Sequence, residues 1–304
     1  MSAGWRGLPL VCPACRGALA ATAAGAACLG CGARYDEVEG VLHLLAGSRG
    51  APGFDPHFFD TLDKVEDRHF WFLGRRAVIL AALRRSVPDL AHRRLFDVGC
   101  GTGGLLAHFD RSGLRLAGAC DVYLESLRLV RRRVDVPLVL VDQGRELPLG
   151  EGHDLLGMFD VLEHVDDDRA MLRSLRHALL PGGVLVLTVP AHPMLFDEMD
   201  ELAHHRRRYT RAALRAVLRD AGFEIRLLNH FMAPLVPALL AARFLGRLLP
   251  SARAPASKRR GMELRVVPGL NAAFRGVLAL ERLAVPRLSL PFGSSIVAVA
   301  SRPS

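Results

Sequence analysis

The 304-residue sequence is poor in lysine and aromatic residues and has no long apolar run. Lysine occurs only at Lys64 and Lys258, so the net charge of +9 comes almost entirely from arginine. No stretch of about 18 uncharged apolar residues is present, so no transmembrane helix is predicted. The first residues lack the apolar core of a secretory signal, and we therefore expect a cytoplasmic protein. Half of the residues are hydrophobic, which is enough for a globular core.

Arginine is concentrated in three short segments of the chain. They are residues 128–133 (RLVRRR), 206–211 (RRRYTR) and 253–265. Such runs favour either a solvated basic surface or contact with an anionic substrate or membrane surface. Both interpretations stay open from the sequence alone.

Four of the six cysteines form two C-x-x-C pairs with twelve residues between them, namely Cys12, Cys15, Cys28 and Cys31. Two such pairs can offer four thiolates to Zn²⁺ in a tetrahedral arrangement. In so small a segment the metal, rather than an apolar core, would hold the fold. We therefore predict a zinc ribbon with structural zinc over residues 1–46, which resembles the ribbon of tRNA-methyltransferase activator proteins. Residues 47–57, rich in glycine and proline, are predicted to be a linker to one domain over 58–304.

Short apolar runs alternate with helical stretches from residue 95 onward. The runs are residues 94–100, 115–121, 138–144, 154–160 and 184–190, followed later by 223–231 and 294–302. This alternation predicts an α/β fold, a doubly wound and mainly parallel sheet with helices on both faces. A helical insert rich in leucine, alanine and arginine, residues 234–290, precedes the last strand. It could pack as a cap or dimer face, cradle a hydrophobic acceptor, or lie on a membrane surface.

The stretch LFDVGCGTGG, residues 95–104, carries a glycine motif. Gly99, Gly101 and Gly104 fit G-x-G-x-x-G, which alone is a weak indication of a dinucleotide site. Asp121 ends the following strand, where a carboxylate can accept both hydroxyl hydrogens of a ribose. Asp142 ends the third strand, near the expected position of an adenine edge.

These residues, together with FDVLEHVDD (159–167) and LLPGGVLVLTVP (179–190), resemble the class I S-adenosylmethionine (SAM) methyltransferases. The resemblance implies SAM as cofactor and a seven-stranded Rossmann-like sheet. It implies that Asp121 binds ribose, that Asp142 or Gln143 contacts adenine, and that Asp97 positions the loop and the amino group of the methionine part. The implied cofactor-binding set is Asp97, Gly99, Cys100, Gly101, Thr102, Gly103, Asp121, Val122, Asp142, Gln143 and Asp160. An NAD-dependent dehydrogenase would explain the glycines but not the Pro-Gly-Gly turn or the Glu-His-Val that follows the fourth strand.

Candidate catalytic residues follow the fourth and fifth strands, where open α/β sheets bind ligands. They are Glu163, His164, His192, His205 and Tyr209. Asp160, Glu163, His164 and His192 could instead hold Mg²⁺ or another divalent ion. A similar E-x-x-E-H pattern carries metal in ubiquinone-pathway O-methyltransferases and small-RNA 2′-O-methyltransferases. Acid–base work, substrate contact and simple bracing of the turn stay open beside the metal interpretation.

The sequence therefore predicts methyl transfer from SAM to a small-molecule or lipid- or isoprenoid-like acceptor, at oxygen or carbon. An RNA methyltransferase is the second hypothesis, because a ribbon and a basic chain suit nucleic acid. Aromatic residues interleaved with basic ones and an N-P-P-[YF]-type motif are both missing, which disfavours it. A third hypothesis is a non-catalytic SAM-binding scaffold for a partner protein.

Overall fold

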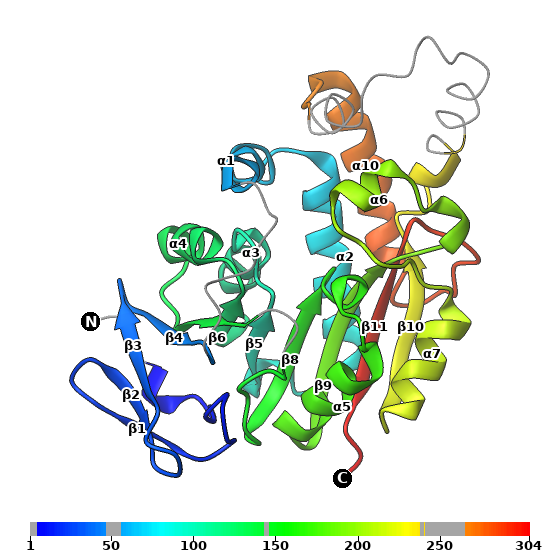
Figure 1. The fold of residues 1–304 in the computed structure, drawn as a ribbon. Coiled ribbons are helices and arrows are strands. Elements are labelled where there is room, and N and C mark those ends of the chain that lie inside the picture. The colour runs from blue at the N-terminus through cyan, green and yellow to red at the C-terminus, as the bar shows by residue number, and fades with distance from the viewer. Residues whose placement is uncertain (1–4, 47–55, 143–145, 238–239, 241–264) are drawn as a thin grey trace.

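The computed structural model describes residues 5–46, 56–142, 146–237, 240 and 265–304. Within these ranges a single sheet runs through the molecule (Figure 1). Its eleven strands lie in the order β1-β2-β3-β4-β7-β6-β5-β8-β9-β11-β10. No helix in these ranges is both long and apolar enough to cross a membrane.

Seven of the strands are the seven that the sequence predicts. They are β5 (Arg94–Val98), β6 (Arg115–Asp121), β7 (Leu138–Val141), β8 (His153–Phe159), β9 (Leu179–Pro190), β10 (Glu224–Phe231) and β11 (Ser295–Ser301). Strands β5 to β9 are parallel, and β11 lies antiparallel between β9 and β10. The chain winds from β5 to β7 in one direction and then continues from β8 on the other side of β5. The adjacent ends of β5 and β8 therefore form the switch point at which such sheets bind ligands.

The sheet has more strands than the seven predicted, because the ribbon segment joins the same sheet. Its strands are β1 (Leu19–Ala21), β2 (Gly25–Cys28), β3 (Arg34–Val38) and β4 (Val41–Leu44). Strand β4 pairs in parallel with the edge strand β7, with Val41 opposite Leu138 and Leu44 opposite Val141. The ribbon thus extends the sheet at this edge, where Figure 1 shows it in dark blue.

The helices cover both faces of the sheet. The α-helices are α1 (Pro56–Val65), α2 (Phe70–Ser86), α3 (Gly104–Arg111), α4 (Leu124–Arg133), α5 (Asp168–Ala178), α6 (Glu198–Leu202), α7 (Arg211–Asp220) and α10 (Pro268–Ala284). Helix α1 begins inside the segment expected to be a linker. Helix α7 starts directly after Thr210, whose side chain accepts a hydrogen bond from the Ala213 amide and caps the helix. Of the expected insert, α10 is seen, and residues 241–264 lie outside the described ranges.

The ribbon also covers one face of the sheet. The described residues between β7 and β8, 142 and 146–152, contain no helix that could cover β5, β6 and β7. Side chains from the ribbon, Trp5, Leu10 and Tyr35, pack in the same buried cluster as Phe96 and Val139. A parallel sheet needs apolar cover on both faces, so the ribbon supplies part of the core of the larger domain.

Hydrogen bonds fasten the ribbon to the β7–β8 connection. The Arg16 guanidinium donates to the carbonyls of Leu147 and Leu149, at 2.6 and 2.9 Å. The Val11 amide donates to the Pro148 carbonyl at 3.0 Å. Each of these bonds joins residues more than 130 positions apart, so the interface is tertiary and not a local turn.

The insert helix α10 packs against α2. Phe70 stacks on Phe274 with ring centroids 4.8 Å apart, and its amide donates to the Asn271 side chain. A Cβ on Gly74 would overlap Leu278, so glycine permits the close approach of the two helices. Phe70, the first residue of α2, therefore fixes the start of this helix against the insert.

Deleting residues 1–46 is expected to make the remaining chain aggregate. The deletion exposes Phe96 and Val139 and leaves β7 as an unpaired edge, a known route to aggregation. Expression and size-exclusion chromatography of residues 47–304 beside the full chain test this. A monodisperse fragment with the melting temperature of the full chain would contradict the shared core.

Candidate active site

The four ribbon cysteines converge in the described structure. The Sγ atoms of Cys12 and Cys31 lie 3.7 Å apart, and those of Cys15 and Cys28 lie 3.4 Å apart. A tetrahedron with zinc–sulfur bonds of about 2.3 Å has sulfur–sulfur edges of about 3.8 Å. The Tyr35 hydroxyl lies 3.0 Å from the Cys12 Sγ. The four cysteines therefore have the spacing and the chemistry of a structural zinc site.

The glycine loop after β5 has a backbone that only glycine adopts easily. Gly99, Gly101 and Gly103 have φ angles of +75°, +52° and +78°. A Cβ on Gly99 would overlap Val161, whereas a Cβ on Gly101 would meet no atom within 4 Å. The loop is thus packed on one side and open on the other, as a cradle for a ligand must be.

The carboxylate that ends β6 closes this loop. Asp121 accepts hydrogen bonds from the amides of Gly101, at 2.8 Å, and Tyr123, at 3.0 Å. Each carboxylate oxygen has a second lone pair, so both can still accept a ribose hydroxyl. The predicted neighbours Cys100, Thr102 and Val122 lie in or beside this turn.

The carboxylate that follows β7 is linked to the ribbon. Asp142 is buried, and its Oδ2 accepts a hydrogen bond of 2.6 Å from the amide of Ala46, two residues after β4. The residue expected to contact adenine is therefore held in part by the ribbon segment. Gln143, the alternative adenine contact, lies outside the described residues.

Asp97 is a buried acid without a full set of partners. Asp97 is 1% exposed, and its Oδ1 accepts no hydrogen bond from the described residues. Burial, opposed by Arg75 and reinforced by Asp121, raises the pKa of Asp97 to about 7. A cationic ligand in the cleft would stabilise the ionised form, so Asp97 fits a positively charged cofactor.

Asp160, at the end of β8, is held by an internal cation. The Arg75 Nη2 lies 2.6 Å from its carboxylate, and the Thr188 hydroxyl donates to it at 2.9 Å. Asp160 has a φ of +55°, a backbone conformation unusual outside glycine and typical of functional sites. The guanidinium groups of Arg75 and of its neighbour Arg76 both pair with acids of the chain itself.

A second cluster lies beside Asp160 and joins two segments. One ligand-type atom from each of Glu163, His164 and His205 lies within 4.8 Å of the other two. Burial and the nearby Asp160 raise the pKa of Glu163. Burial, assisted by His205, lowers the pKa of His164 to about 4, so this imidazole is neutral at physiological pH. The set expected for Mg²⁺ does not assemble, because neither Asp160 nor His192 belongs to the group that converges.

The other two candidate catalytic residues lie apart from this cluster. The His192 ring stacks on His230 with centroids 5.0 Å apart. Tyr209 is buried, and its hydroxyl donates to Asp168 at 2.8 Å. That bond, together with burial, raises the pKa of Tyr209, so its geometry is that of a brace between α5 and the segment before α7.

The arginine run before α7 pairs with acids on neighbouring segments. The pairs are Arg206 with Asp166, Arg207 with Asp168, and Arg208 with Asp200. Asp200 also accepts a 2.8 Å hydrogen bond from His205, a role that the sequence analysis missed. The only signal for it was its position five residues before the histidine.

Glu66 is a further residue that sequence reasoning missed. It is buried beside the glycine loop, where its carboxylate pairs with Arg76 and Arg133, each at 2.7 Å. A Cβ on Gly104 would overlap both Arg76 and Glu66. The segment joining α1 and α2 thus lies directly against the start of α3. No motif marks Glu66, because its partners are ten and 67 positions away.

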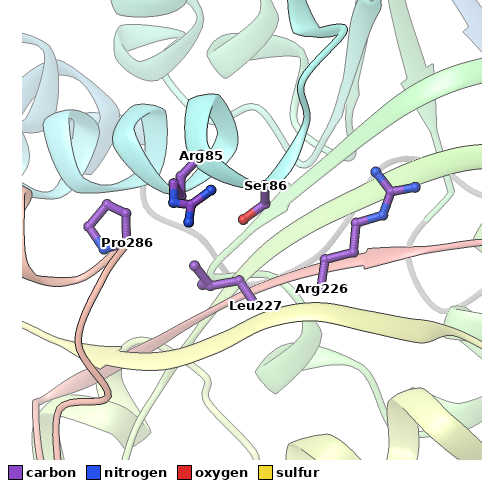
Figure 2. A pocket seen from close by; sticks show the side chains of 5 residues that line it. All are labelled: Arg85, Ser86, Arg226, Leu227 and Pro286. Atoms are coloured by element: carbon purple, nitrogen blue, oxygen red, sulfur yellow. The ribbon is translucent and has the colours of Figure 1, made fainter.

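A surface hollow lies beside β10, at the edge of the sheet away from the ribbon (Figure 2). It is lined by Arg85 and Ser86 at the end of α2, Arg226 and Leu227 near the start of β10, and Pro286 beyond α10. Since β10 runs parallel to β9, the start of β10 is opposite the glycine loop. This hollow is therefore separate from the predicted site.

Comparison with known proteins identifies the family. The family model described as a methyltransferase domain matches residues 71–228, which is half of the chain. The chain therefore belongs to the S-adenosylmethionine-dependent methyltransferases that this domain defines.

Individual relatives match only part of the chain, two of them at 30 and 34% identity. A ubiquinone biosynthesis O-methyltransferase of Xanthomonas oryzae pv. oryzae is 34% identical over 33% of this chain and 44% of its own length. A dTDP-4-amino-2,3,4,6-tetradeoxy-D-glucose N,N-dimethyltransferase of Saccharopolyspora spinosa is 30% identical over 50% of this chain and 63% of its own. The chain spans about half the length of the curated relatives it matches.

Solved structures share the fold. A chain in the complex of the Haloferax volcanii Trm112 methyltransferase activator with a candidate methyltransferase superposes with a TM-score of 0.53 at 18% identity. That match covers 82% of this chain and 95% of the other. Phosphoethanolamine N-methyltransferase 2 of Haemonchus contortus, solved with SAM, gives 0.51 at 18% identity, over 83% of this chain and 61% of its own. At these identities the likeness concerns the fold alone.

Replacing Asp97 with asparagine is expected to change how stability depends on pH. The folded-state pKa of about 7 lies above the unfolded value of about 4. Ionisation therefore costs the wild type stability as the pH rises through this window, a loss of roughly 1–4 kcal/mol that is complete above pH 7. The amide side chain of the variant does not ionise. Denaturant unfolding of both proteins between pH 5 and 8 should show the Asp97→Asn variant gaining relative stability with pH. Parallel curves would contradict the raised pKa.

Proposed function

We propose that the protein binds SAM in the glycine cradle and transfers its methyl group to a small acceptor. The observation that carries the proposal is the open positive-φ turn, closed by Asp121 and lying beside the unsatisfied carboxylate of Asp97. We assign Asp121 to the ribose hydroxyls and Asp142 to the adenine. Asp97 supplies negative charge for the cationic methionine part. Residues 1–46 would be the ribbon domain and residues 58–304 the catalytic domain.

Methyl transfer needs an acceptor oriented in line with the sulfonium carbon. The cofactor supplies the electrophile, so the remaining task of the protein is to hold the acceptor and to handle its proton. We assign this side of the site to Glu163, His164 and His205, with His192 at the end of β9. Tyr209 is assigned a positioning role, since its hydroxyl is already bonded to Asp168.

We favour an acceptor with an apolar part. Large apolar side chains are exposed on the segment that follows β9, including Met194, which is 83% exposed, Phe196 and Leu202. Helix α10 exposes Leu270, Val277, Leu280 and Leu283. Figure 1 shows α6 and the start of α10 at the same end of the molecule. An apolar rim of this kind suits a lipid-like acceptor or peripheral contact with a membrane.

Nucleic acid is a weaker candidate partner. Free arginines would be needed to neutralise phosphates. Most described arginines of the runs 128–133 and 206–211 pair with acids of the chain, for example Arg128 with Glu39, Arg133 with Glu66 and Arg206 with Asp166. The names of the relatives in the comparison support a small molecule, since they include ubiquinone biosynthesis and amino-sugar methylation.

Calorimetry with SAM, its demethylated product and NAD tests the cofactor. We expect SAM and the product to bind and NAD to bind far more weakly. Asp121→Ala should weaken SAM binding by at least tenfold, about 1.4 kcal/mol, because it removes a charged acceptor and loosens the Gly101 turn. Asp110→Ala, an exposed change on α3, is the matched control. Preferential binding of NAD would overturn the proposal. Mass spectrometry of cell extract treated with the protein and isotope-labelled SAM then identifies the acceptor.

Loss of zinc from the ribbon should weaken cofactor binding. We propose that Cys12, Cys15, Cys28 and Cys31 bind one structural Zn²⁺. Because Ala46 bonds Asp142 and β4 pairs with β7, an unfolded ribbon would release the adenine side of the pocket. Cys28→Ser should lose the zinc, lower the melting temperature by roughly 10 °C and weaken SAM binding.

Leu29→Ser, at the exposed neighbour of Cys28, is the control for this change and should behave as wild type. Metal analysis, thermal melts and calorimetry give the three readouts. Full SAM affinity in a zinc-free variant would separate the ribbon from the cofactor pocket.

A further inference from the structure

Two segments of the chain meet at the cluster beside Asp160, which consists of Glu163, His164 and His205. Glu163 and His164 come from the single turn η3 (Leu162–His164) after β8, and His205 comes from the segment after α6. The Arg206 amide donates to the Glu163 carbonyl at 2.9 Å, and the Arg206 Nε donates to the His164 carbonyl at 3.0 Å. The three side chains therefore face one another from a fixed backbone.

Glu163 is a carboxylic acid with no partner of its own. Its side chain is fully buried, and within the described residues neither carboxylate oxygen accepts a hydrogen bond. The Nε2 of His205 lies 3.9 Å from the Glu163 Oε1, which is too long for a hydrogen bond. A buried polar group left in this way is costly, which indicates that the position is built for a ligand.

The two histidines are oriented so that each keeps one ring nitrogen free. The His205 Nδ1 lies 2.8 Å from the Asp200 Oδ1, and the His164 Nδ1 lies 3.2 Å from the His204 carbonyl. A carboxylate and a carbonyl only accept, so each Nδ1 carries a hydrogen, and in the neutral imidazole each Nε2 presents a lone pair. A metal-binding histidine shows this same arrangement, with its second nitrogen bonded to a carboxylate or a carbonyl.

The two carboxylates nearby, those of Asp160 and Asp200, are already paired with arginines. The carboxylate of Asp160 is paired with Arg75 and Thr188. The carboxylate of Asp200 is paired with Arg208, so it supports His205 and is not a ligand itself. Both histidines are partly exposed, which gives an ion a path from solvent.

We propose that Glu163, His164 and His205 bind a divalent transition-metal ion of the Zn²⁺, Co²⁺ or Mn²⁺ type. Two imidazoles and one carboxylate suit these ions, whereas Mg²⁺ prefers oxygen ligands alone. The ligand atoms, now within 4.8 Å of one another, would move inward by roughly 1 Å to reach bonds of about 2.1 Å. Three protein ligands leave a position open for water or an acceptor oxygen.

Binding of the ion does not depend on the proposed methyl transfer, but its use in catalysis does. A bound ion would attract an acceptor carrying a hydroxyl group and lower the pKa of that hydroxyl. It would therefore favour O-methylation over C-methylation.

Cobalt titration of the full-length, zinc-loaded protein tests the site. Co²⁺ bound by histidine and carboxylate gives weak visible bands, whereas Co²⁺ that enters the ribbon adds intense near-ultraviolet thiolate bands. We expect one Co²⁺ per chain without the thiolate bands. Glu163→Gln and His205→Asn should each weaken binding at least tenfold, and Asp200→Asn should weaken it by about tenfold through the lost support of His205.

The matched control is His177→Asn, an exposed histidine on α5 outside the cluster, which should bind Co²⁺ as the wild type does. Thermal melts show whether each variant is folded. If a histidine variant does not fold, the nearly isosteric Glu163→Gln still tests the site. Absence of Co²⁺ uptake outside the ribbon, or equal uptake by Glu163→Gln, would overturn the site. A protein that binds SAM but not Co²⁺ refutes only this inference, whereas one that binds Co²⁺ but not SAM refutes only the proposed function.

Discussion

Apolar cover on both faces of a buried parallel sheet is the constraint on which the rest of this molecule depends. Helices α2, α3, α4 and α10 supply it on one face, and α5 and α7 supply part of it on the other. Over β5, β6 and β7 the second face is completed by the ribbon, through Trp5, Leu10 and Tyr35. A segment with little core of its own thus gains a core by completing that of its neighbour, which explains why both backbone pairing and side-chain packing join them.

The same junction reaches the candidate site. Strand β4 lies along β7, and two residues beyond its end the Ala46 amide bonds Asp142. On the other side of the glycine loop, Glu66 fixes the segment joining α1 and α2 through Arg76 and Arg133. The cradle after β5 is therefore supported by contacts from both edges, although neither the ribbon nor α1 belongs to the segment that matches the methyltransferase family.

Among the described residues of the site, some acids are paired with an arginine and others are not. Asp160 is paired with Arg75, and Asp200 with Arg208. Asp97 and Glu163 are buried without full compensation, one beside the predicted cofactor and the other beside the predicted acceptor. Both positions favour a positive charge from a ligand, which is the reason that the cofactor and a metal ion are assigned to them.

Local sequence pattern alone was sufficient to predict the seven strands of the larger domain. The seven predicted apolar runs form β5 to β11. Thr210 caps α7, and the two C-x-x-C pairs converge. Each of these features depends on residues that are close together in the sequence. The sequence likewise predicted the positions of the glycine turn and of Asp121, since both follow strand ends. The number of strands in the sheet was underestimated, because the pairing of β4 with β7 joins residues about 97 positions apart and leaves no periodic signal.

Which charged residues are available to a ligand was decided only by the tertiary structure. From the sequence, the arginines of residues 206–208 could contact an external anion, yet each pairs with a carboxylate on another segment of the chain. Arg75 and Arg76 are paired in the same way. Likewise Asp160 lies outside the group of side chains that converge with Glu163 and His205 lies within it, since Arg75 pairs with Asp160 and Asp200 accepts a hydrogen bond from His205. Strands and turns are determined over a few neighbouring residues, whereas the partner of a long charged side chain depends on which distant segment folds against it.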